Sequence, residues 1–207
     1  FSRPVAGPVP SVDGLKDGFS VMFAGNIGSA QAVEVMIEAA VLLREYTDIH
    51  FVILGDGSRR DWMLQEVTAR HLSNVHLPGN FPLESMPGFM QKASALLVTL
   101  SNHAIFAATV PNKIQAYMAV GRPILACLNG EGARVVVEAE AGLSVPAEDG
   151  RGLSEAVLQL YRMPVIEREL LGSNGREYFN DHFNYDKLLV ELVDHFQMVL
   201  KDKKDVN

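Results

Sequence analysis

The stretch ALLVTLSNHAIFAATVPNKIQAYMAVGRPILACLNGEG, residues 95–132, determines the architecture of this chain. Two apolar runs within it, Ala95 to Leu100 and Ile124 to Leu128, predict buried strands. A helix is predicted between them over residues 112–119, because the segment follows a proline and ends at Gly121. Parallel strands that each lead through a loop into a helix place helix N-termini at one sheet edge, which is where open α/β sheets bind ligands. Exposed N–H groups and helix dipoles favour a phosphate at that edge.

The same alternation of strands and helices continues along the rest of the chain. Further strands are predicted over 19–25, 50–55, 74–77 and 142–145, and further helices over 31–44, 59–71, 84–93, 133–139, 153–161, 165–181 and 185–201. This alternation predicts the α/β class, with a doubly wound parallel sheet of about six strands and C-terminal helices. The expected organisation is a proline- and glycine-rich linker or arm over 1–18, a folded domain over 19–184, and a C-terminal helix and tail over 185–207.

Composition excludes several classes of function. The 207 residues are 48% hydrophobic, enough for one sizeable core, and their formal net charge of −7 argues against non-specific nucleic-acid binding. The only cysteine, Cys127, rules out an internal disulfide, fits a reducing, cytoplasmic compartment, and is predicted to be buried rather than nucleophilic. No stretch reaches the ~20 apolar residues of a membrane span. The chain begins with Phe1 rather than Met, so we expect a fragment of a longer protein.

Glycine-containing turns follow the first two predicted strands, at Gly25 to Gly28 and at Gly55 to Gly57. Glycine permits both a tight turn and the close approach of a phosphate, so a plain turn explains each motif as well as a ligand site does. The two arginines after the second turn fit either a phosphate contact or a solvated helix start. The candidate ligand-binding residues of these turns are Asn26, Gly28, Gly55, Gly57, Arg59 and Arg60.

Two cations lie at predicted helix starts; the helix dipole disfavours the charge of Lys113 there unless an anion is near, and the fork of the Arg134 guanidinium suits a phosphate. Lys113 follows a proline and an asparagine, and Arg134 follows a glycine-rich loop. Both fit a phosphate contact, and both also fit a solvated surface. His103 is a weak candidate, because a lone loop histidine usually faces solvent, and no spacing typical of metal ligands occurs, so no metal is expected. Neighbouring candidate ligand residues are Asn112, Gln115, Glu131, Gly132 and Ala133.

Six motifs together resemble the C-terminal donor-binding domain of a GT-B glycosyltransferase of the family-4 type. They cover nearly the whole chain after the arm, and the segment over 110–126 is the most specific. The combination of GNIG, PNKIQAYMA and GEGAR is most similar to a bacterial subgroup that transfers N-acetyl-fucosamine-type sugars during surface polysaccharide assembly. The motifs are FAGNIG at 23–28, FVILGDGSRR at 51–60, VHLPGNFP at 75–82, VPNKIQAYMAVGRPILA at 110–126, GEGARVV at 130–136 and AGLSVPAEDGRGLSEAV at 141–157.

The resemblance implies a Rossmann-like domain, one half of a GT-B fold, that binds a nucleotide diphosphate sugar for retaining transfer. The donor is a substrate, expected to be UDP-linked, and no cofactor is implied. By position, the base would lie against Gly79, Asn80 and Phe81, and the diphosphate against Gly28, Lys113 and the loop over 130–134. Lys113 and Arg134 would then hold the catalytic role. The expected partner is an N-terminal acceptor-binding domain, with peripheral association of the full-length enzyme at the inner face of the membrane.

The sequence departs from the family pattern at two places. Two glutamates eight residues apart are usual, but Ala108 and Ala116 stand at the matching positions, with Gln115 as a substitute ribose ligand. Asn26 and the run over 29–31 replace the Arg and Lys that usually follow the first strand. Two alternatives therefore stay open: one half of a nucleotide-sugar 2-epimerase, which would need carboxylates that the loop over 99–111 lacks, and a degenerate, non-catalytic docking domain.

Overall fold

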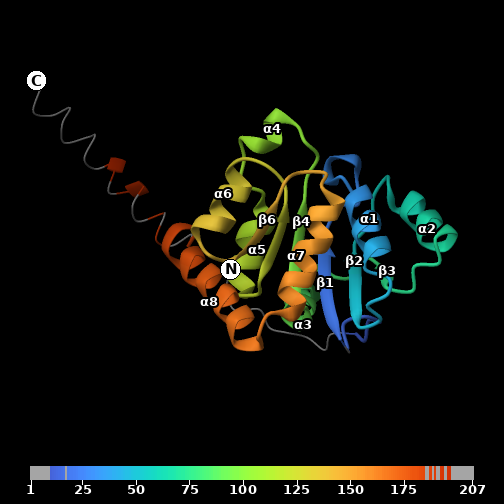
Figure 1. Cartoon of the computed structure of the whole chain (residues 1–207). Helices are drawn as coiled ribbons and strands as arrows, with labels where there is room; N and C mark the ends of the chain where they lie inside the picture. Colours follow the sequence, from blue (N-terminus) through green and yellow to red (C-terminus); the bar gives the residue numbers. More distant parts are fainter. Residues whose placement is uncertain are drawn as a thin grey trace, which may run out of the picture.

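The computed structural model describes residues 10–16 and 18–184, together with residues 187, 189, 192, 193, 195 and 196. Its strands form one sheet in the order β3-β2-β1-β4-β5-β6, and every neighbouring pair in this sheet is parallel (Figure 1). The winding order reverses between β1 and β4, which confirms the predicted doubly wound α/β class. The strands are β1 Phe19–Ala24, β2 Ile49–Leu54, β3 Val75–Gly79, β4 Ala95–Thr99, β5 Ile124–Cys127 and β6 Gly142–Val145.

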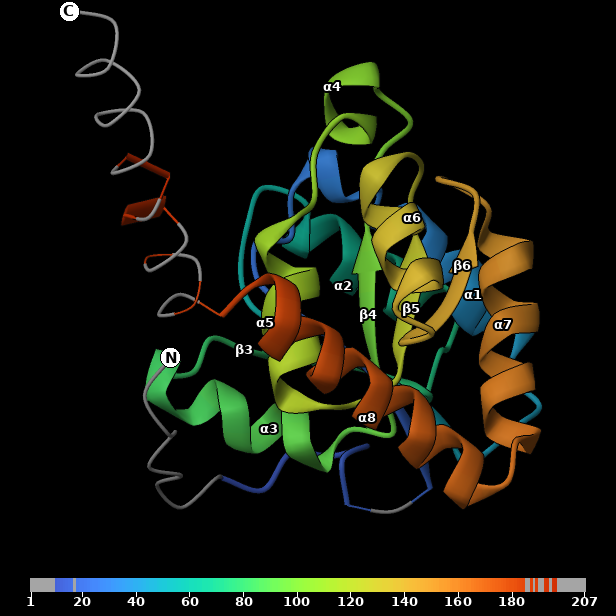
Figure 2. The same cartoon turned by 90° about the vertical axis from the view of Figure 1, so that its left-hand side faces the viewer.

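Helices cover both faces of the sheet (Figures 1 and 2). One face carries α1 Glu34–Leu42, α2 Arg60–Ala69 and α7 Gly150–Arg162. The other carries α3 Met86–Lys92, α5 Asn112–Val120 and α6 Glu131–Glu138, with α8 Val165–His182 packed against α5. The short helix α4 Ala104–Ala107 lies beyond the C-terminal end of β4, in the connection to α5.

The core is divided into two layers by the sheet, because successive side chains of a strand point to opposite faces. In β1, Phe19, Val21 and Phe23 pack on the side of α1, whereas Met22 and Ala24 pack on the side of α5. Every residue of β1 is buried. A central parallel strand is covered on both faces, which explains why its sequence is a continuous apolar run rather than an alternating one.

Several predicted boundaries are wrong, and the starts of α1 and α7 shift for a local reason. The helix predicted from residue 31 begins at Glu34 instead, because Ala32 has a left-handed φ of 43° and separates α1 from a short 3-10 turn over Ser29–Gln31. Helix α7 begins three residues early because Asp149 accepts a hydrogen bond from the Gly152 amide (2.7 Å). Helix α6 begins at residue 131 rather than 133, and α4 was not predicted. Strand β3 continues through a proline, which an edge strand tolerates.

The two terminal segments are described only in part. Most of the predicted arm over 1–18 lies outside the described residues, but Val12 and Leu15 are buried against the sheet. Residues 10–16 are therefore packed on the domain rather than extended from it. The helix predicted over 185–201 falls largely outside the described residues.

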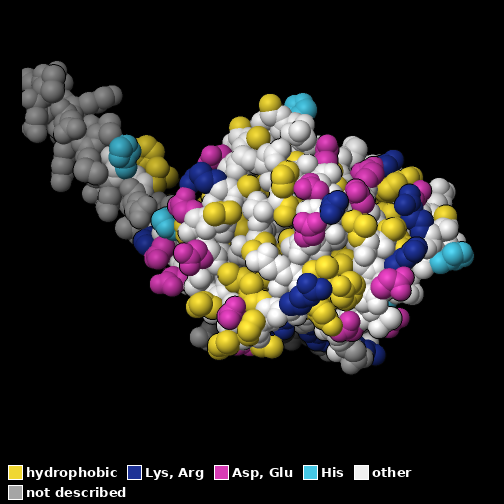
Figure 3. Space-filling model, in the orientation of Figure 1, with side chains coloured by type: hydrophobic (Ala, Val, Ile, Leu, Met, Phe, Trp, Pro, Cys, Tyr) yellow, Lys and Arg dark blue, Asp and Glu magenta, His cyan; other side chains and the backbone are white. Residues whose placement is uncertain are grey.

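The surface over α1, α2 and α7 is mixed in character. Figure 3 shows acidic, basic and apolar side chains interspersed over this face, rather than gathered into a field of one sign. Among the described residues, none of the helices has the length and hydropathy that crossing a membrane requires. The predicted ligand-binding residues lie instead around the C-terminal edge of the sheet.

Candidate functional site

The crevice expected in a doubly wound sheet lies where β1 and β4 separate. Strand β1 leads toward α1 on one face and β4 leads toward α5 on the other, so the connections diverge and leave space above the strand ends. The β1–β4 ladder pairs Val21 with Ala95 and Met22 with Leu96. Beyond it, the Ala24 amide donates a hydrogen bond to the hydroxyl of Tyr117 (3.2 Å), which fixes α5 to the end of β1.

Lys113 crosses this edge of the sheet. Its helix packs on one face, yet its ammonium lies 3.7 Å from the ring centroid of Phe23, whose side chain belongs to the core on the other face. Gly25 makes the crossing possible, because a Cβ atom there would lie 2.8 Å from Cε of Lys113. Burial lowers the pKa of Lys113 to about 8. Among the described residues, no carboxylate forms an ion pair with this ammonium. The site therefore contains a partly desolvated cation without a counter-ion.

The two glycine turns pack directly against each other. The Ile27 amide donates a hydrogen bond to the Asp56 carbonyl (2.7 Å), and the Gly55 amide donates to the Gly79 carbonyl (3.0 Å). A Cβ at Gly55 would lie 1.9 Å from the Gly25 carbonyl oxygen, and one at Gly57 would lie 2.5 Å from the carbonyl oxygen of Ile27. Backbone packing thus explains why both positions in the second turn are glycine. It also brings the first turn beside the ends of β2 and β3.

A hollow of about 320 Å³ opens beside these turns, at the ends of β1, β2 and β3. Leu54, Phe81 and Met86 give it apolar walls, and the Phe81 ring packs 4.7 Å from the ring centroid of Phe89. Such walls, with amide and carboxylate groups at the rim, suit a flat heteroaromatic ring. The hollow therefore brings together four of the residues predicted at these strand ends, Asn26, Gly55, Asn80 and Phe81. The other predicted residues there do not line it: Gly28, Gly57, Arg59, Arg60 and Gly79. The lining residues are Gly25, Asn26, Leu54, Gly55, Asp56, Asn80, Phe81, Leu83 and Met86.

The two predicted arginines after β2 have different surroundings. Arg59 forms an ion pair with Glu34 of α1, and its guanidinium lies 4.4 Å from the ring centroid of Trp62, so its charge is already compensated. Arg60 forms no ion pair among the described residues. One of its guanidinium nitrogens lies 4.0 Å from where a Cβ of Gly79 would be, so Arg60 is the arginine nearer to the end of β3.

Arg134, the second predicted catalytic residue, is paired on its own helix. Its guanidinium binds Glu131 (2.9 Å) and Glu138, and Glu131 raises its pKa. Glu138 also accepts a hydrogen bond from the hydroxyl of Tyr178 on α8 (3.0 Å). The structure therefore joins Arg134 and the predicted ligand residue Glu131 to each other rather than to Lys113. A catalytic role for Arg134 stays a prediction.

The remaining predicted residues lie around the same edge. The Gly28 amide donates to the Gln31 side chain (3.2 Å), and Gly132 is buried against Pro111 and Ile114. Asn112 is exposed, whereas Gln115 and Ala133 are half-buried. His103 caps α4 by accepting a hydrogen bond from the Ile105 amide (3.2 Å). Within the described part of the chain, no group of three or more His, Cys, Asp or Glu side chains is placed to hold a metal ion.

Sequence reasoning missed Phe23 and Tyr117, which the structure places around Lys113. Both lie in strongly apolar segments, and both read there as ordinary core residues. A signal was present for Tyr117, since a buried tyrosine hydroxyl needs a hydrogen-bond partner. For Phe23 no local signal exists, because its contact with Lys113 joins residues 90 positions apart.

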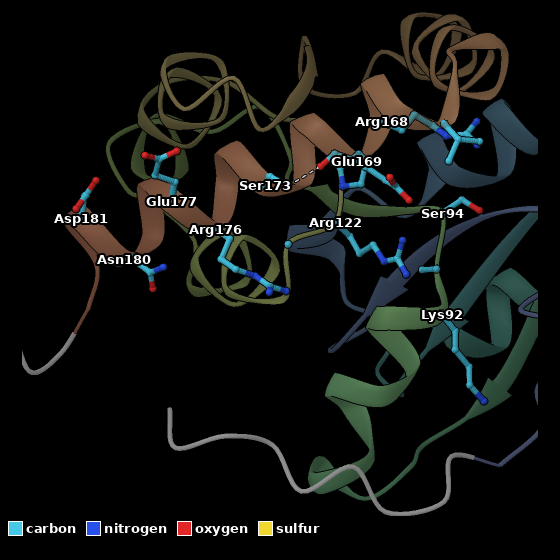
Figure 4. Close-up of a pocket in the computed structure, with 14 residues that line it drawn as sticks. Lys92, Ser94, Arg122, Arg168, Glu169, Ser173, Arg176, Glu177, Asn180 and Asp181 are labelled. Carbon is cyan, nitrogen blue, oxygen red and sulfur yellow. Dashed lines mark hydrogen bonds between the residues drawn. The ribbon is translucent and has the colours of Figure 1, made fainter.

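A larger hollow of about 730 Å³ lies at the opposite edge of the sheet, between α8 and the starts of β4 and β5 (Figure 4). Its arginines bind backbone carbonyls at helix C-termini: Arg122 donates to the Gln91 carbonyl, and Arg176 donates to that of Val120. Arg168 donates to the carbonyls of Leu160 and Tyr161 at 3.0 and 3.2 Å. Because these contacts satisfy terminal carbonyls of α3, α5 and α7, they account for the cations without any ligand.

Comparison with known proteins identifies the family of the chain. Residues 18–163 match the family described as "Glycosyl transferases group 1". The chain belongs to this family. It is similar to "Alpha-D-kanosaminyltransferase" from Streptomyces kanamyceticus (30% identical over 165 residues) and to "Putative colanic acid biosynthesis glycosyl transferase WcaI" from Escherichia coli K12 (33% over 104 residues). These matches cover 78% and 49% of the chain but 41% and 24% of the relatives, so the chain spans less than half the length of either.

Comparison with a solved structure confirms the fold of this group 1 domain. HepE from Anabaena, solved in complex with UDP and glucose, superposes with a TM-score of 0.74 at 17% identity. The match covers 89% of this chain and 49% of HepE. Likeness at that identity establishes the Rossmann-like fold expected from the GT-B resemblance, whereas ligands and chemistry depend on the residues of the site.

Proposed function

We propose that this chain is the donor-binding domain of a retaining glycosyltransferase and binds a UDP-linked sugar at the C-terminal edge of its sheet. The observation that carries the proposal is the half-buried ammonium of Lys113, which has no ion-pair partner among the described residues. Its side chain lies against Gly25, which with Phe81 lines the hollow. A nucleoside diphosphate matches both features, because its base is flat and its phosphates are anionic. The complex of HepE with UDP and glucose supports this choice of nucleotide.

In this proposal the base lies against Phe81 and the backbone of Gly79 and Asn80, and the diphosphate lies near Lys113 and Gly28. Lys113 stabilises the negative charge that develops on the departing diphosphate, so its contribution to catalysis is electrostatic. Arg134 would first have to leave its two carboxylates. We therefore assign the main catalytic role to Lys113 and an auxiliary one to Arg134. No cofactor and no general base from this domain are required.

The finer assignments follow from the resemblance described above. We propose that the intact enzyme transfers an N-acetyl-fucosamine-type sugar during bacterial surface polysaccharide assembly, in the cytoplasm at the inner face of the membrane. An N-terminal domain would bind the acceptor and complete the site. The similarity to a protein named for colanic acid biosynthesis supports a role in polysaccharide assembly.

Calorimetric titration with UDP, GDP and dTDP at low salt tests the proposal. We expect saturable binding of UDP and a loss of about tenfold or more in Lys113→Ala, because a charge-assisted contact is worth about 1.5–3 kcal/mol. Lys92→Ala is the matched control, since this lysine is exposed beside the hollow at the opposite edge. Equal UDP affinity in wild type and Lys113→Ala would refute the site.

The second candidate function is a non-catalytic docking domain. It is favoured by the exposed Ala108 and the half-buried Ala116 at the two positions where the family pattern has glutamates. This candidate predicts that no nucleotide binds saturably, even to the full-length protein. Repeating the titration on the full-length protein therefore separates the two functions.

A further inference from the structure

The surroundings of Lys113 differ from those of Arg59 and Arg134, two other cations at this edge. Arg59 binds one carboxylate and Arg134 binds two, so the protein itself already compensates both charges. The Lys113 ammonium instead lies over the face of the Phe23 ring, at 3.7 Å from the centroid. A ring face attracts a cation through its quadrupole but carries no net charge, so it leaves the positive charge of the site intact.

The backbone and one hydroxyl fix this arrangement. Gly25 has φ +135° and no side chain, so the lysine can pass over the end of β1 to reach a ring on the other face of the sheet. The hydroxyl of the fully buried Tyr117, one helical turn after Lys113, accepts the Ala24 amide hydrogen bond. This bond sets the distance between the helix that carries the lysine and the strand that carries Phe23.

We propose that Phe23 is a positioning residue for the donor diphosphate. Its ring holds the Lys113 ammonium at the sheet edge while no anion is present, and the ammonium moves from the ring to the diphosphate when the nucleotide binds. This inference rests on the proposed function. It adds a role for Phe23, a core residue that does not itself touch the donor.

A carboxylate in place of the ring would serve this purpose less well. It would neutralise Lys113, and the donor would have to break an ion pair before gaining one. The ring contact is weaker, at about 0.5–2 kcal/mol, so a diphosphate displaces it readily. The ring thus gives the lysine a defined position without removing the charge that attracts the ligand.

The decisive experiment compares Phe23→Leu with Phe51→Leu in the full chain. Phe51 is the matched control, because it is a buried phenylalanine of the neighbouring strand that faces the same core layer. Because UDP binding ends the ring contact, Phe23→Leu should strengthen UDP binding about two- to tenfold relative to Phe51→Leu, by the cation–π free energy that the wild type gives up. In a Lys113→Ala background Phe23→Leu should have no further effect, because the two residues act through each other. Equal UDP affinities in both phenylalanine variants, or an undiminished gain without the lysine, would overturn the inference.

NMR of the wild-type lysine keeps the test independent of folding in the variants and of the proposed function. Without ligand, the ε-methylene protons of Lys113 should be shifted upfield by the ring face, and UDP should remove that shift. If wild type binds no nucleotide, the proposed function fails, yet the shift without ligand still reports whether the ring holds the lysine. An unshifted ε-methylene without ligand, or an upfield shift that persists when UDP is bound, would exclude the role of Phe23.

Discussion

The two edges of the sheet use positive charge in opposite ways. At the N-terminal edge, Arg122, Arg168 and Arg176 each donate to carbonyls at a helix C-terminus (Figure 4). At the C-terminal edge, Lys113 lies over an aromatic ring and has no carboxylate partner among the described residues. The difference shows that a cation indicates a ligand site only where the protein itself does not satisfy it.

Helix dipoles explain which edge is which. In a doubly wound sheet the helices run antiparallel to the strands, so their C-termini gather at the N-terminal edge and favour cations there. Their N-termini gather at the other edge and disfavour cations unless an anion is present. Lys113, the second residue of α5, is therefore placed against the local field. A bound anion should therefore stabilise the charge of Lys113. The charges of the three arginines are favourable without a ligand.

The largest effect is expected from adding a methyl group to a glycine at each edge. Gly55→Ala should destabilise the fold by about 3–5 kcal/mol, because its Cβ would lie 1.9 Å from a backbone oxygen and its φ is +140°. Gly121→Ala should lose only about 1–2 kcal/mol, since its Cβ meets the end of the flexible Arg176 side chain. Urea unfolding measures both, and equal losses would show that the turns at the C-terminal edge are not the more tightly constrained.

Replacing the unpaired lysine should stabilise the domain. Lys113→Met removes a partly buried charge, and we expect a gain of about 1–3 kcal/mol in unfolding free energy at pH 7, since one unit of pKa corresponds to about 1.4 kcal/mol. The folded pKa of Lys113, about 8, is below its unfolded value, so the unfolded chain binds more protons between pH 8 and 10.5. Wild type should therefore gain stability as the pH rises through that window. Lys113→Met should not gain it, and a destabilised Lys113→Met variant would contradict the view that this charge serves a ligand.

Replacing an arginine at the N-terminal edge should have the opposite result. Arg176→Met leaves the Val120 carbonyl without its side-chain donor and should lower the unfolding free energy by about 1 kcal/mol. UDP affinity, measured by calorimetry, should not change. A loss of affinity comparable to that of Lys113→Ala would mean that the two edges are not separate in function.

The fold that the sequence predicts is confirmed, and the location of the site stays a prediction; both predictions depend on local patterns. Apolar runs and glycine positions indicate the strands and their order of connection, and a lysine at a helix start indicates an electrostatic conflict. The ion pairs of Arg134 were also within reach of the sequence, since Glu131 and Glu138 stand three and four residues away on one helix. The contact of Lys113 with Phe23 was not, because it depends on how closely α5 approaches the end of β1. Only the tertiary structure therefore shows which of these cations is free to bind an anion and which is already paired with a carboxylate.

The smallest expected effect concerns a histidine pair near the starts of β2 and β3. The rings of His50 and His76 are joined by a 3.2 Å contact between nitrogens, and a Cβ at Gly14 would lie 2.5 Å from the His76 ring, so the arm residues cover the pair. Burial first, and His50 second, lower the pKa of His76, whereas Asp13 opposes the shift. The unfolded chain therefore binds more protons below about pH 6.5, and stability should fall by less than about 1 kcal/mol as the pH drops through that value.

Urea unfolding at pH 7.5 and 5.5 should show this loss of stability in wild type and a smaller loss in His76→Asn. The pair lies at the opposite edge from Lys113. The UDP affinity of the folded protein should therefore not change with the protonation of His76. A loss of affinity in parallel with the loss of stability would show that the two edges are coupled.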